Sequence, residues 1–388
     1  MKSVYHATWL HNLTLVKEAK EWMNHHLIEQ EQFSAIKTAH PSDFYHPNLM
    51  IRILLFIATL IALSGVTGVL ALIVAEGGQS IISILCLLYG IGSFVVLEKV
   101  FIEKMKHYKS GVTEALLYHS IGWTIGGVAG LTDFNAHAVI LTSTIIFSFA
   151  AFRYLDLIST TCALASFAYL IFYEMYEAGG MLQFVIPFAF LLVFTPFYFL
   201  VKQIKKSRGR EPWQNCLVLL EALCLLLIYA AGNYLVVREL SVNLMNLYLE
   251  EGQNIPYAFI FYVLTVTTPI AYLYFGIKNK DAVLLRVSLV VIVFSVFTFK
   301  FYYSLGHPEI TVTIGGAVLL ITSLYLFRYL KTPKGGYTRE NLLRDKWSNS
   351  NAEAFIMSQT LGGNSVTTDG QTASGGGTFG GGGSSDSF

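Results

Sequence analysis

Ten long apolar segments are the feature of this sequence that most constrains its fold. A helix needs about 20 consecutive apolar residues to cross a bilayer, where lipid offers free backbone groups no hydrogen-bond partner. Only 13% of the residues are charged, about half the share in a typical soluble domain. The sequence therefore predicts an all-α fold, a polytopic bundle of about ten transmembrane helices. The predicted spans are residues 49–75, 80–101, 112–131, 135–152, 155–177, 180–201, 213–237, 257–277, 282–304 and 310–331.

The basic residues predict how this bundle is oriented. Short cytoplasmic loops are enriched in lysine and arginine. If the N-terminus is cytoplasmic, only Arg238 and Lys300 of the 26 basic residues fall in outer connections, and Arg286 lies inside the ninth span. A wrong number of spans would mix the two sides. Both termini are therefore expected to be cytoplasmic.

Changes in composition divide the chain into four regions. Residues 1–48 form a cytoplasmic N-terminal segment with two short helices between positions 12 and 40, which carry too little apolar surface for a core of their own and are expected to pack on the membrane domain. Residues 49–331 form the transmembrane domain of about ten helices, and residues 332–361 a juxtamembrane segment of helical character. Residues 362–388 are rich in glycine and serine, a composition typical of a disordered tail.

The tail allows two interpretations. It is a spacer, or it is a flexible peptide whose Phe379 and Phe388 are bound by another protein. Its Gly-rich, aromatic-ended composition resembles the tails of several bacterial membrane-associated proteins.

Both ends of the membrane-associated chain resemble one family. The segment "WMNHHLIEQEQFSAI", the polar linker after it and "RILLFIATLIALSGVTGVLALIVA" are similar to the opening of an uncharacterised family of predicted bacterial multi-spanning membrane proteins, a domain of unknown function. The stretch "FKFYYSLGHPEITVTIGGAVLLITSLYLFRYLK" is similar to its closing pair of spans, although a basic residue expected just after the turn "LGHPE" is missing. The resemblance implies a multi-pass protein of the bacterial inner (cytoplasmic) membrane and supplies no catalytic residues.

Glu221 is the most unusual residue of the predicted spans. It lies about 12 Å along its helix from Trp213, at a rise of about 1.5 Å per residue, and so close to the middle of the bilayer. A carboxylate at that depth costs on the order of 3 kcal/mol unless it is protonated, paired or hydrated, so it should face the interior of the bundle. His119 on the third span is a candidate partner. The alternative to a transport or proton-relay role is a structural hydrogen bond that fixes helix packing.

Other polar residues extend this candidate pathway. Thr265 and Thr268 precede Pro269 in the eighth span, where a proline leaves a carbonyl free for another donor. Asn233 could line an outer vestibule. The third span carries Gly122, Gly126 and Gly130, which are expected to allow close helix approach. If the ten spans form two inverted halves, the third and eighth spans correspond, and paired interruptions of this kind point to a transporter site.

Two functions remain open. The first is a transporter or channel for a small solute or ion, with Glu221, His119, Thr265, Thr268 and Asn233 along the pathway. The second is a membrane scaffold or sensor that recruits partners through its cytoplasmic ends. The sequence lacks hydrolase and phosphate-loop motifs, so we expect neither an enzyme nor a cofactor. The histidines show no metal-ligand spacing, and the expected partners are the lipid bilayer and a protein at the tail, with no nucleic acid.

Overall fold

The computed structural model describes residues 3–302, apart from 75, 208 and 245–252, together with isolated positions between 316 and 331. Within this part of the chain the secondary structure is helical, and the only β pairing is an isolated bridge between Tyr45 and His107. The predicted tenth span lies outside the described residues except for those isolated positions. The juxtamembrane segment and the tail with Phe379 and Phe388 lie outside them entirely.

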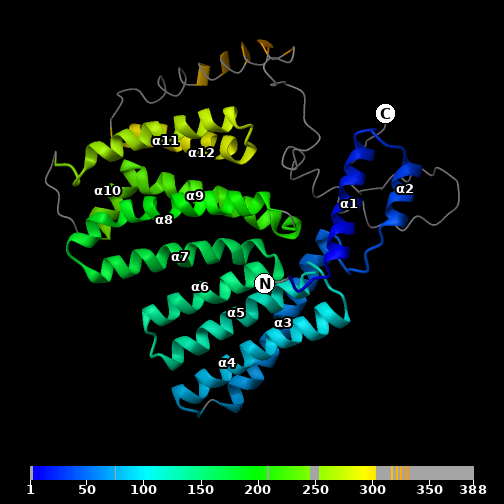
Figure 1. Ribbon diagram of the computed structural model, residues 1–388. Coiled ribbons are helices and arrows are strands. Elements are labelled where there is room, and N and C mark those ends of the chain that lie inside the picture. Colours follow the sequence, from blue (N-terminus) through cyan, green and yellow to red (C-terminus); the bar gives the residue numbers. More distant parts are fainter. Residues whose placement is uncertain are drawn as a thin grey trace, which may run out of the picture.

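The helices follow one another in chain order, and the connections within the helix pairs of the bundle are short (Figure 1). Their bounds are α1 Ala7–Asn24, α2 Gln30–Ala39, α3 Leu49–Ile73, α4 Gln79–Val96, the π-helical η1 Leu97–Lys104, α5 Val112–Leu131, α6 Ala136–Tyr154, α7 Leu157–Ala178, α8 Met181–Lys206, the 3₁₀ segment η2 Glu211–Trp213, α9 Gln214–Gly232, α10 Tyr234–Asn243, α11 Ala258–Lys278 and α12 Ala282–Tyr302.

Eight of these helical stretches are long and apolar enough to cross a membrane, which makes the chain a multi-pass membrane protein. They are α3, α4 with η1, α6, α7, α8, η2 with α9, α11 and α12. The predicted third span forms α5 but is not among the eight. Polar residues such as Glu114, His119 and Thr124 lower its hydropathy, and α3, α4 and α6 pack around it. A helix enclosed by other helices needs fewer apolar residues than one that faces lipid.

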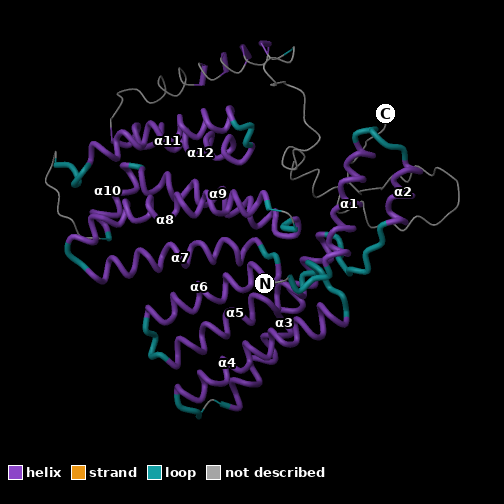
Figure 2. Tube along the Cα trace, in the orientation of Figure 1, coloured by secondary structure: helices purple, strands orange, loops and turns teal. Residues whose placement is uncertain are grey.

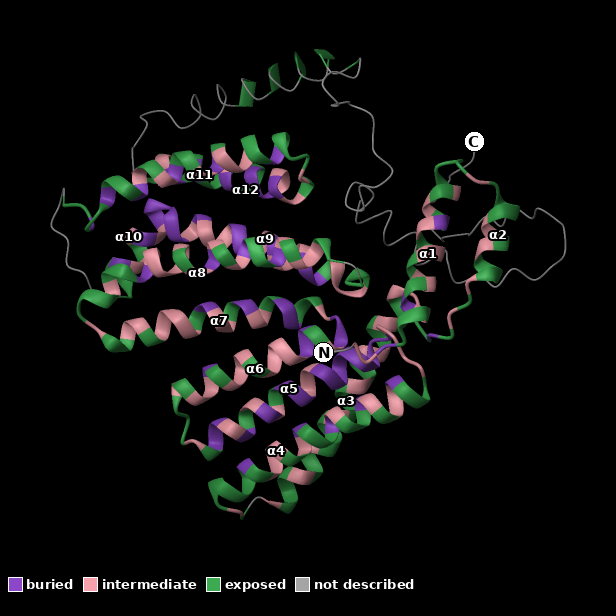
Figure 3. Ribbon diagram, in the orientation of Figure 1, coloured by how far each residue is buried: buried purple, intermediate pink, exposed green. Residues whose placement is uncertain are grey.

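The bundle is built from consecutive antiparallel helix pairs, in which α4 packs on α5, α6 on α7, α8 on α9 and α11 on α12 (Figure 2). The connections inside these four pairs lie at the same end of the bundle as residues 3–10. We call it the basic end, because Lys106, Arg153, Lys205 and Lys278 lie at or beside these connections. We call α3–α6 the first half of the bundle and α7–α12 the second half. Figure 3 shows many buried residues along α5 and α9 and mostly exposed or half-buried ones along α3.

Glycines bring α4 and α5 close together, although not all of the expected ones do so. A Cβ atom added at Gly127 would lie 2.6 Å from the backbone nitrogen of Leu87, and one at Gly130 would meet the side chain of Ser83. Gly122 and Gly126 have open space at their Cβ positions. The prediction of close approach is therefore right for Gly130 and wrong for Gly122 and Gly126, because those two residues point away from α4.

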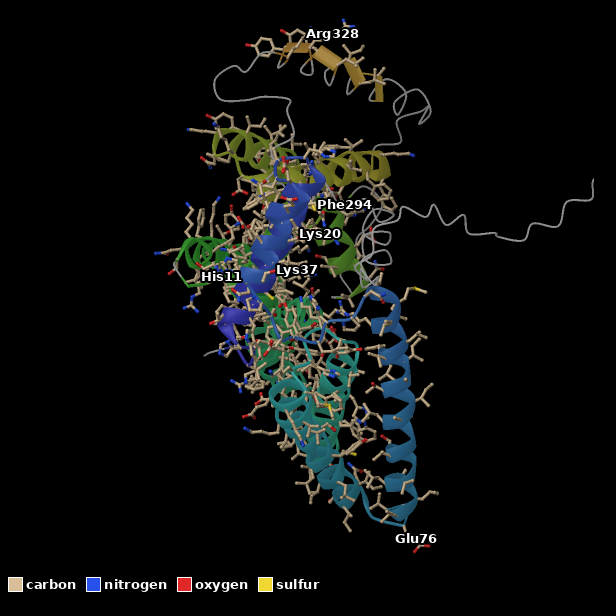
Figure 4. All side chains as sticks on the ribbon, turned by 90° about the vertical axis from the view of Figure 1, so that its right-hand side faces the viewer. His11, Lys20, Lys37, Glu76, Phe294 and Arg328 are labelled. Carbon is tan, nitrogen blue, oxygen red and sulfur yellow. The ribbon has the colours of Figure 1, made fainter. Side chains whose placement is uncertain are left out.

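The N-terminal segment attaches at the basic end through its two flanks. The amide of Val4 donates to the carbonyl of Arg153 at 3.0 Å, and Tyr45 pairs with the backbone on both sides of His107. Tyr5 and Phe44 pack with Tyr108, whose burial raises its pKa to about 12. The α1–α2 hairpin itself projects from the bundle, and α2 buries none of its residues. Figure 4, which looks onto this end, shows Lys20 and Lys37 on the hairpin and α3 along one side of the bundle.

Candidate functional site

One face of α9 carries the candidate site. Glu221, Leu225, Tyr229 and Asn233 follow at four-residue spacing and therefore lie above one another on one face of the helix and at its end. All four are buried, and Glu221 and Asn233 have no exposed surface at all. This helix packs on α8, α11 and α12. We call the buried contact of these four helices the polar seam.

Glu221 lies toward the basic end of the polar seam and forms an ion pair with Lys205. The Nζ of Lys205, in the last turn of α8, donates to Oε2 of Glu221. The other carboxylate oxygen, Oε1, is buried and has no hydrogen-bond partner among the described residues. A carboxylate usually accepts several hydrogen bonds, so this one retains unused capacity for a proton, a cation or another donor.

A second ion pair lies one turn away on α8. Lys202 donates to Asp281 at 2.7 Å and to the hydroxyl of Tyr198 at 3.1 Å. Asp281 is in the loop between α11 and α12, where its carboxylate also accepts from the amides of Val283 and Leu284 and so caps α12. Burial raises the pKa of Asp281, but the Lys202 ammonium and the Leu284 amide outweigh it and hold that pKa below its usual value. The pair ties the α11–α12 loop to α8.

Asn233 ends α9 and organises the other end of the seam. Its backbone is extended, and its side chain accepts from the amide of Val236, so it caps α10. Its Nδ2 donates to the hydroxyls of Tyr229 at 2.9 Å and Thr298 at 3.0 Å. The prediction of one continuous span over 213–237 is therefore wrong, because Gly232 and Asn233 break the helix.

Pro269 introduces a second backbone interruption at the same level. A proline cannot donate to the carbonyl four residues earlier, which here belongs to Thr265. That carbonyl instead accepts from the hydroxyl of Ser295 on α12 at 2.9 Å. The hydroxyl of Thr265 accepts from the amide of Tyr234 at 2.9 Å, so the side chain of α11 satisfies a backbone donor released by the break after α9.

The structure brings some of the predicted site residues together and separates others. Thr265 and Asn233 lie close together, because Thr265 accepts from the amide of Tyr234, the residue after Asn233, and both bond to hydroxyls of α12. Thr268 is half-buried on α11, one turn from Thr265. Glu221 lies three turns away on α9. His119 lies in the other half of the bundle, on α5, with its ring 5.1 Å from Tyr89 and its Nε2 buried without a hydrogen-bond partner among the described residues. No hydrogen bond joins the Nε2 of His119 to Glu221, and α5 packs mainly on α3, α4 and α6.

Sequence reasoning missed the lysine partners. It ended the sixth span at 201 and assigned Lys202 and Lys205 to a loop, whereas α8 continues to Lys206. The signal was present, because Tyr198, Lys202 and Lys205 recur at helical spacing and so share one face. Ser295 and Thr298 were missed because a single hydroxyl in an apolar span is common and gives no signal by itself.

The first half of the bundle has charge pairs of another kind. The carboxylate of Glu98 on η1 accepts three hydrogen bonds. Two come from Arg153, through Nε at 2.8 Å and Nη2 at 2.9 Å, and the third comes from the hydroxyl of Tyr154. Glu114 pairs with Arg52 through one oxygen, and its other oxygen accepts from the amide of Gly111 at 2.8 Å. Both carboxylates are thus satisfied on both oxygens.

The comparisons place the chain in no known group. No family model matches it, and no curated protein or solved structure matches it either. The class defined by its fold is that of a multi-pass helical membrane protein, and the resemblance to a family of unknown function stays a prediction. Among the described residues no cluster of histidine, cysteine or acidic side chains could hold a metal ion.

Proposed function

We propose that the protein is a transporter or channel-like protein for a small solute or ion, and that the polar seam is its pathway. The observation that carries the proposal is the Glu221 carboxylate, which is completely buried within a membrane helix and paired through only one oxygen. Ionisable groups inside membranes are costly, and they mark substrate, ion and proton pathways in membrane proteins.

The seam offers polar groups along its length. Between Glu221 and Asn233, the hydroxyl of Tyr272 donates to the carbonyl of Leu225 at 3.1 Å, and Tyr229 joins the Asn233 network. The two helix interruptions, at Asn233 and Pro269, lie at the far end from Lys205. Interrupted helices near one another form the binding sites of many secondary transporters. A substrate here would replace the hydroxyls of Ser295 and Thr265, which hold the released backbone groups.

The Lys205–Glu221 pair supplies a mechanism for exchange. A cation that binds Glu221 must compete with the Lys205 ammonium, and a proton on Glu221 removes the attraction that holds the ammonium there. Either event frees Lys205 to extend toward the nearby end of α8, because a lysine stem can lie along apolar surface while its charge reaches water. The pair would thus couple ion or proton binding to a rearrangement at the basic end.

The proposal includes a topology of ten spans with both termini in the cytoplasm, and the inner membrane of a bacterial cell as the location. Its support is that the connections within all four helix pairs lie at one end, with most of the basic residues at or near it. In this topology α5 also spans the bilayer, and its burial by α3, α4 and α6 explains its modest hydropathy.

Flux through the reconstituted protein tests the proposal. The full chain would be reconstituted into vesicles that contain a pH-sensitive dye. Gradients of alkali cations and a panel of small solutes would then be applied, and the change in internal pH would be recorded. We expect Glu221→Gln to abolish the protein-dependent flux, and Glu103→Gln, in an exposed ion pair with Lys99, to preserve it. If Glu221→Gln transports as well as the unaltered protein, the assignment of Glu221 is wrong.

A second candidate function is a scaffold or sensor, and the projecting α1–α2 hairpin favours it. Trp22 and Leu27 are 38% and 55% exposed on this hairpin, where a partner could bind them. Residues 362–388, with Phe379 and Phe388, would be a second recruiting segment. Co-purification of the full chain and of a chain without residues 362–388 tests this segment, because the scaffold proposal requires that a partner be lost on deletion.

A further inference from the structure

An apolar groove lies between the two halves of the bundle, separate from the polar seam. It has a volume of about 520 Å³ and is lined by residues of α6, α7, α8, η2 and α9. Ala163 and Phe167 of α7 contribute to it, as do Phe152 of α6, Phe197 of α8 and Leu220 of α9. The volume falls within the range of roughly 300–1,000 Å³ that is typical of small-molecule sites.

The groove lies in the part of the bundle near the basic end. Most of its lining residues are in the C-terminal halves of α6 and α8 and in the N-terminal halves of α7 and α9, and Thr144 and Val193 lie at the middle of α6 and α8. Those halves adjoin the connections α6–α7 and α8–α9. A ligand that enters from the bilayer would therefore come from the leaflet on this side.

Most polar groups of the lining, Ser148 excepted, are turned toward the backbone. Nε1 of Trp213 donates to the carbonyl of Phe152 at 2.9 Å, the hydroxyl of Thr160 to Asp156 at 2.6 Å, and the hydroxyl of Thr144 to Ile140 at 2.9 Å. These donors are already used, so water in the groove would find few partners. The groove is therefore suited to a hydrocarbon chain.

A cation lies beside this apolar groove. Arg210, which is exposed, places its guanidinium 5.8 Å from the ring centroid of Trp213. Trp213 also lines the groove. Tryptophan prefers the level of the lipid headgroups, and arginine binds phosphate through several donors at once. The groove and Arg210 together are complementary to one anionic lipid, since the groove suits an apolar tail and Arg210 suits an anionic head.

We propose that this groove binds one acyl chain of an anionic phospholipid from the adjacent leaflet, with the lipid phosphate at Arg210. A bound chain would fill the space between α6 and the α8–α9 pair, which otherwise contact each other mainly through α7. The inference is independent of transport, since Glu221 does not line the groove.

Quenching of tryptophan fluorescence tests this lipid site. The purified full chain in detergent would be titrated with phosphatidylglycerol that carries brominated acyl chains, since bromine quenches only tryptophans that it contacts. The contribution of Trp213 is obtained by comparison with Trp213→Phe. We expect saturable quenching of Trp213 at about one lipid per protein. Brominated phosphatidylcholine should require a concentration about fivefold higher, because its choline cation neutralises the phosphate and so removes the net attraction to Arg210, about 1 kcal/mol.

Two variants separate the chain from the headgroup. Ala163→Phe fills the groove and should remove the saturable quenching, whereas Ala62→Phe on the exposed face of α3 should not. Arg210→Gln changes only an exposed side chain and should make the two lipids equivalent. Quenching that rises without saturation, or that is equal for both lipids in the unaltered protein, would overturn the proposal, as would full saturable quenching in Ala163→Phe.

Discussion

Glu98 and Glu114 in the first half of the bundle differ from Glu221 in the second half in how fully they are bound. The first two accept hydrogen bonds on both oxygens and retain 24% and 11% side-chain exposure. Glu221 has no exposure and a partner on one oxygen only. Carboxylates that are bonded on both oxygens fix the positions of neighbouring helices, whereas Glu221 joins α9 to α8 through one oxygen and leaves the other unused. Under the transport proposal, burial and the number of hydrogen bonds together distinguish the carboxylate of Glu221 from the two in the first half.

The largest expected effect comes from removing the lysine that pairs with Glu221. Lys205→Met leaves a buried carboxylate without its counter-charge, which costs about 3–5 kcal/mol in comparable buried pairs. We expect a large fall in the melting temperature of the purified protein in detergent. The double variant Lys205→Met with Glu221→Leu should recover most of it, because two apolar groups can replace a buried pair.

The recovery of the melting temperature in the double variant decides whether the buried charge causes the loss of stability. If the double variant is as unstable as Lys205→Met alone, the cost comes from lost packing of the lysine stem, and Glu221 is not an unsatisfied charge in the variant.

A smaller fall in melting temperature is expected when the hydroxyl of Ser295 is removed. Ser295→Ala removes the hydrogen bond to the Thr265 carbonyl that Pro269 leaves without its helical partner. An unsatisfied buried carbonyl costs about 1–3 kcal/mol. Ser143→Ala, whose hydroxyl bonds only within α6, is the matched control and should melt close to the unaltered protein. Equal melting of the two variants would show that the carbonyl finds another donor.

The smallest effect is a dependence of stability on acid. Because the pKa of folded Asp281 lies below its usual value, the ionised carboxylate stabilises the fold at pH values above the unfolded pKa of about 3.9. That contribution is lost as the pH falls through the lower pKa of the folded state. The difference in melting temperature between the unaltered protein and Asp281→Asn should therefore shrink from about pH 6 to about pH 3. A difference that stays constant over this range would contradict the role of the Lys202–Asp281 pair.

The helices could be read from the sequence because bilayer thickness fixes their length. The predicted starts of α3, α5, α11 and α12 lie within one residue of the observed ones. The break at Asn233 was missed because an apolar run continues through it, and only the capping preference of asparagine after Gly232 marked it. Hydropathy records which residues avoid water and does not record where the backbone turns.

The site was less predictable than the fold. Burial of Glu221 followed from the energy of a carboxylate in lipid, but its partner did not. His119 was chosen by depth along the chain, whereas Lys205 is brought to Glu221 by the tight connection between α8 and α9. Depth can be counted from a sequence, but the rotation of a helix about its axis depends on packing against neighbours that the sequence does not locate.

The central claim is that the carboxylate of Glu221 moves an ion or solute, while that of Glu98 only holds helices together. The measurement that tests it most directly compares Glu221→Gln with Glu98→Gln, in flux through vesicles and in melting temperature. We predict that Glu221→Gln loses flux while the protein remains folded, and that Glu98→Gln melts earlier but transports. If Glu98→Gln loses flux and Glu221→Gln keeps it, the functional carboxylate lies in the first half of the bundle and the account is wrong.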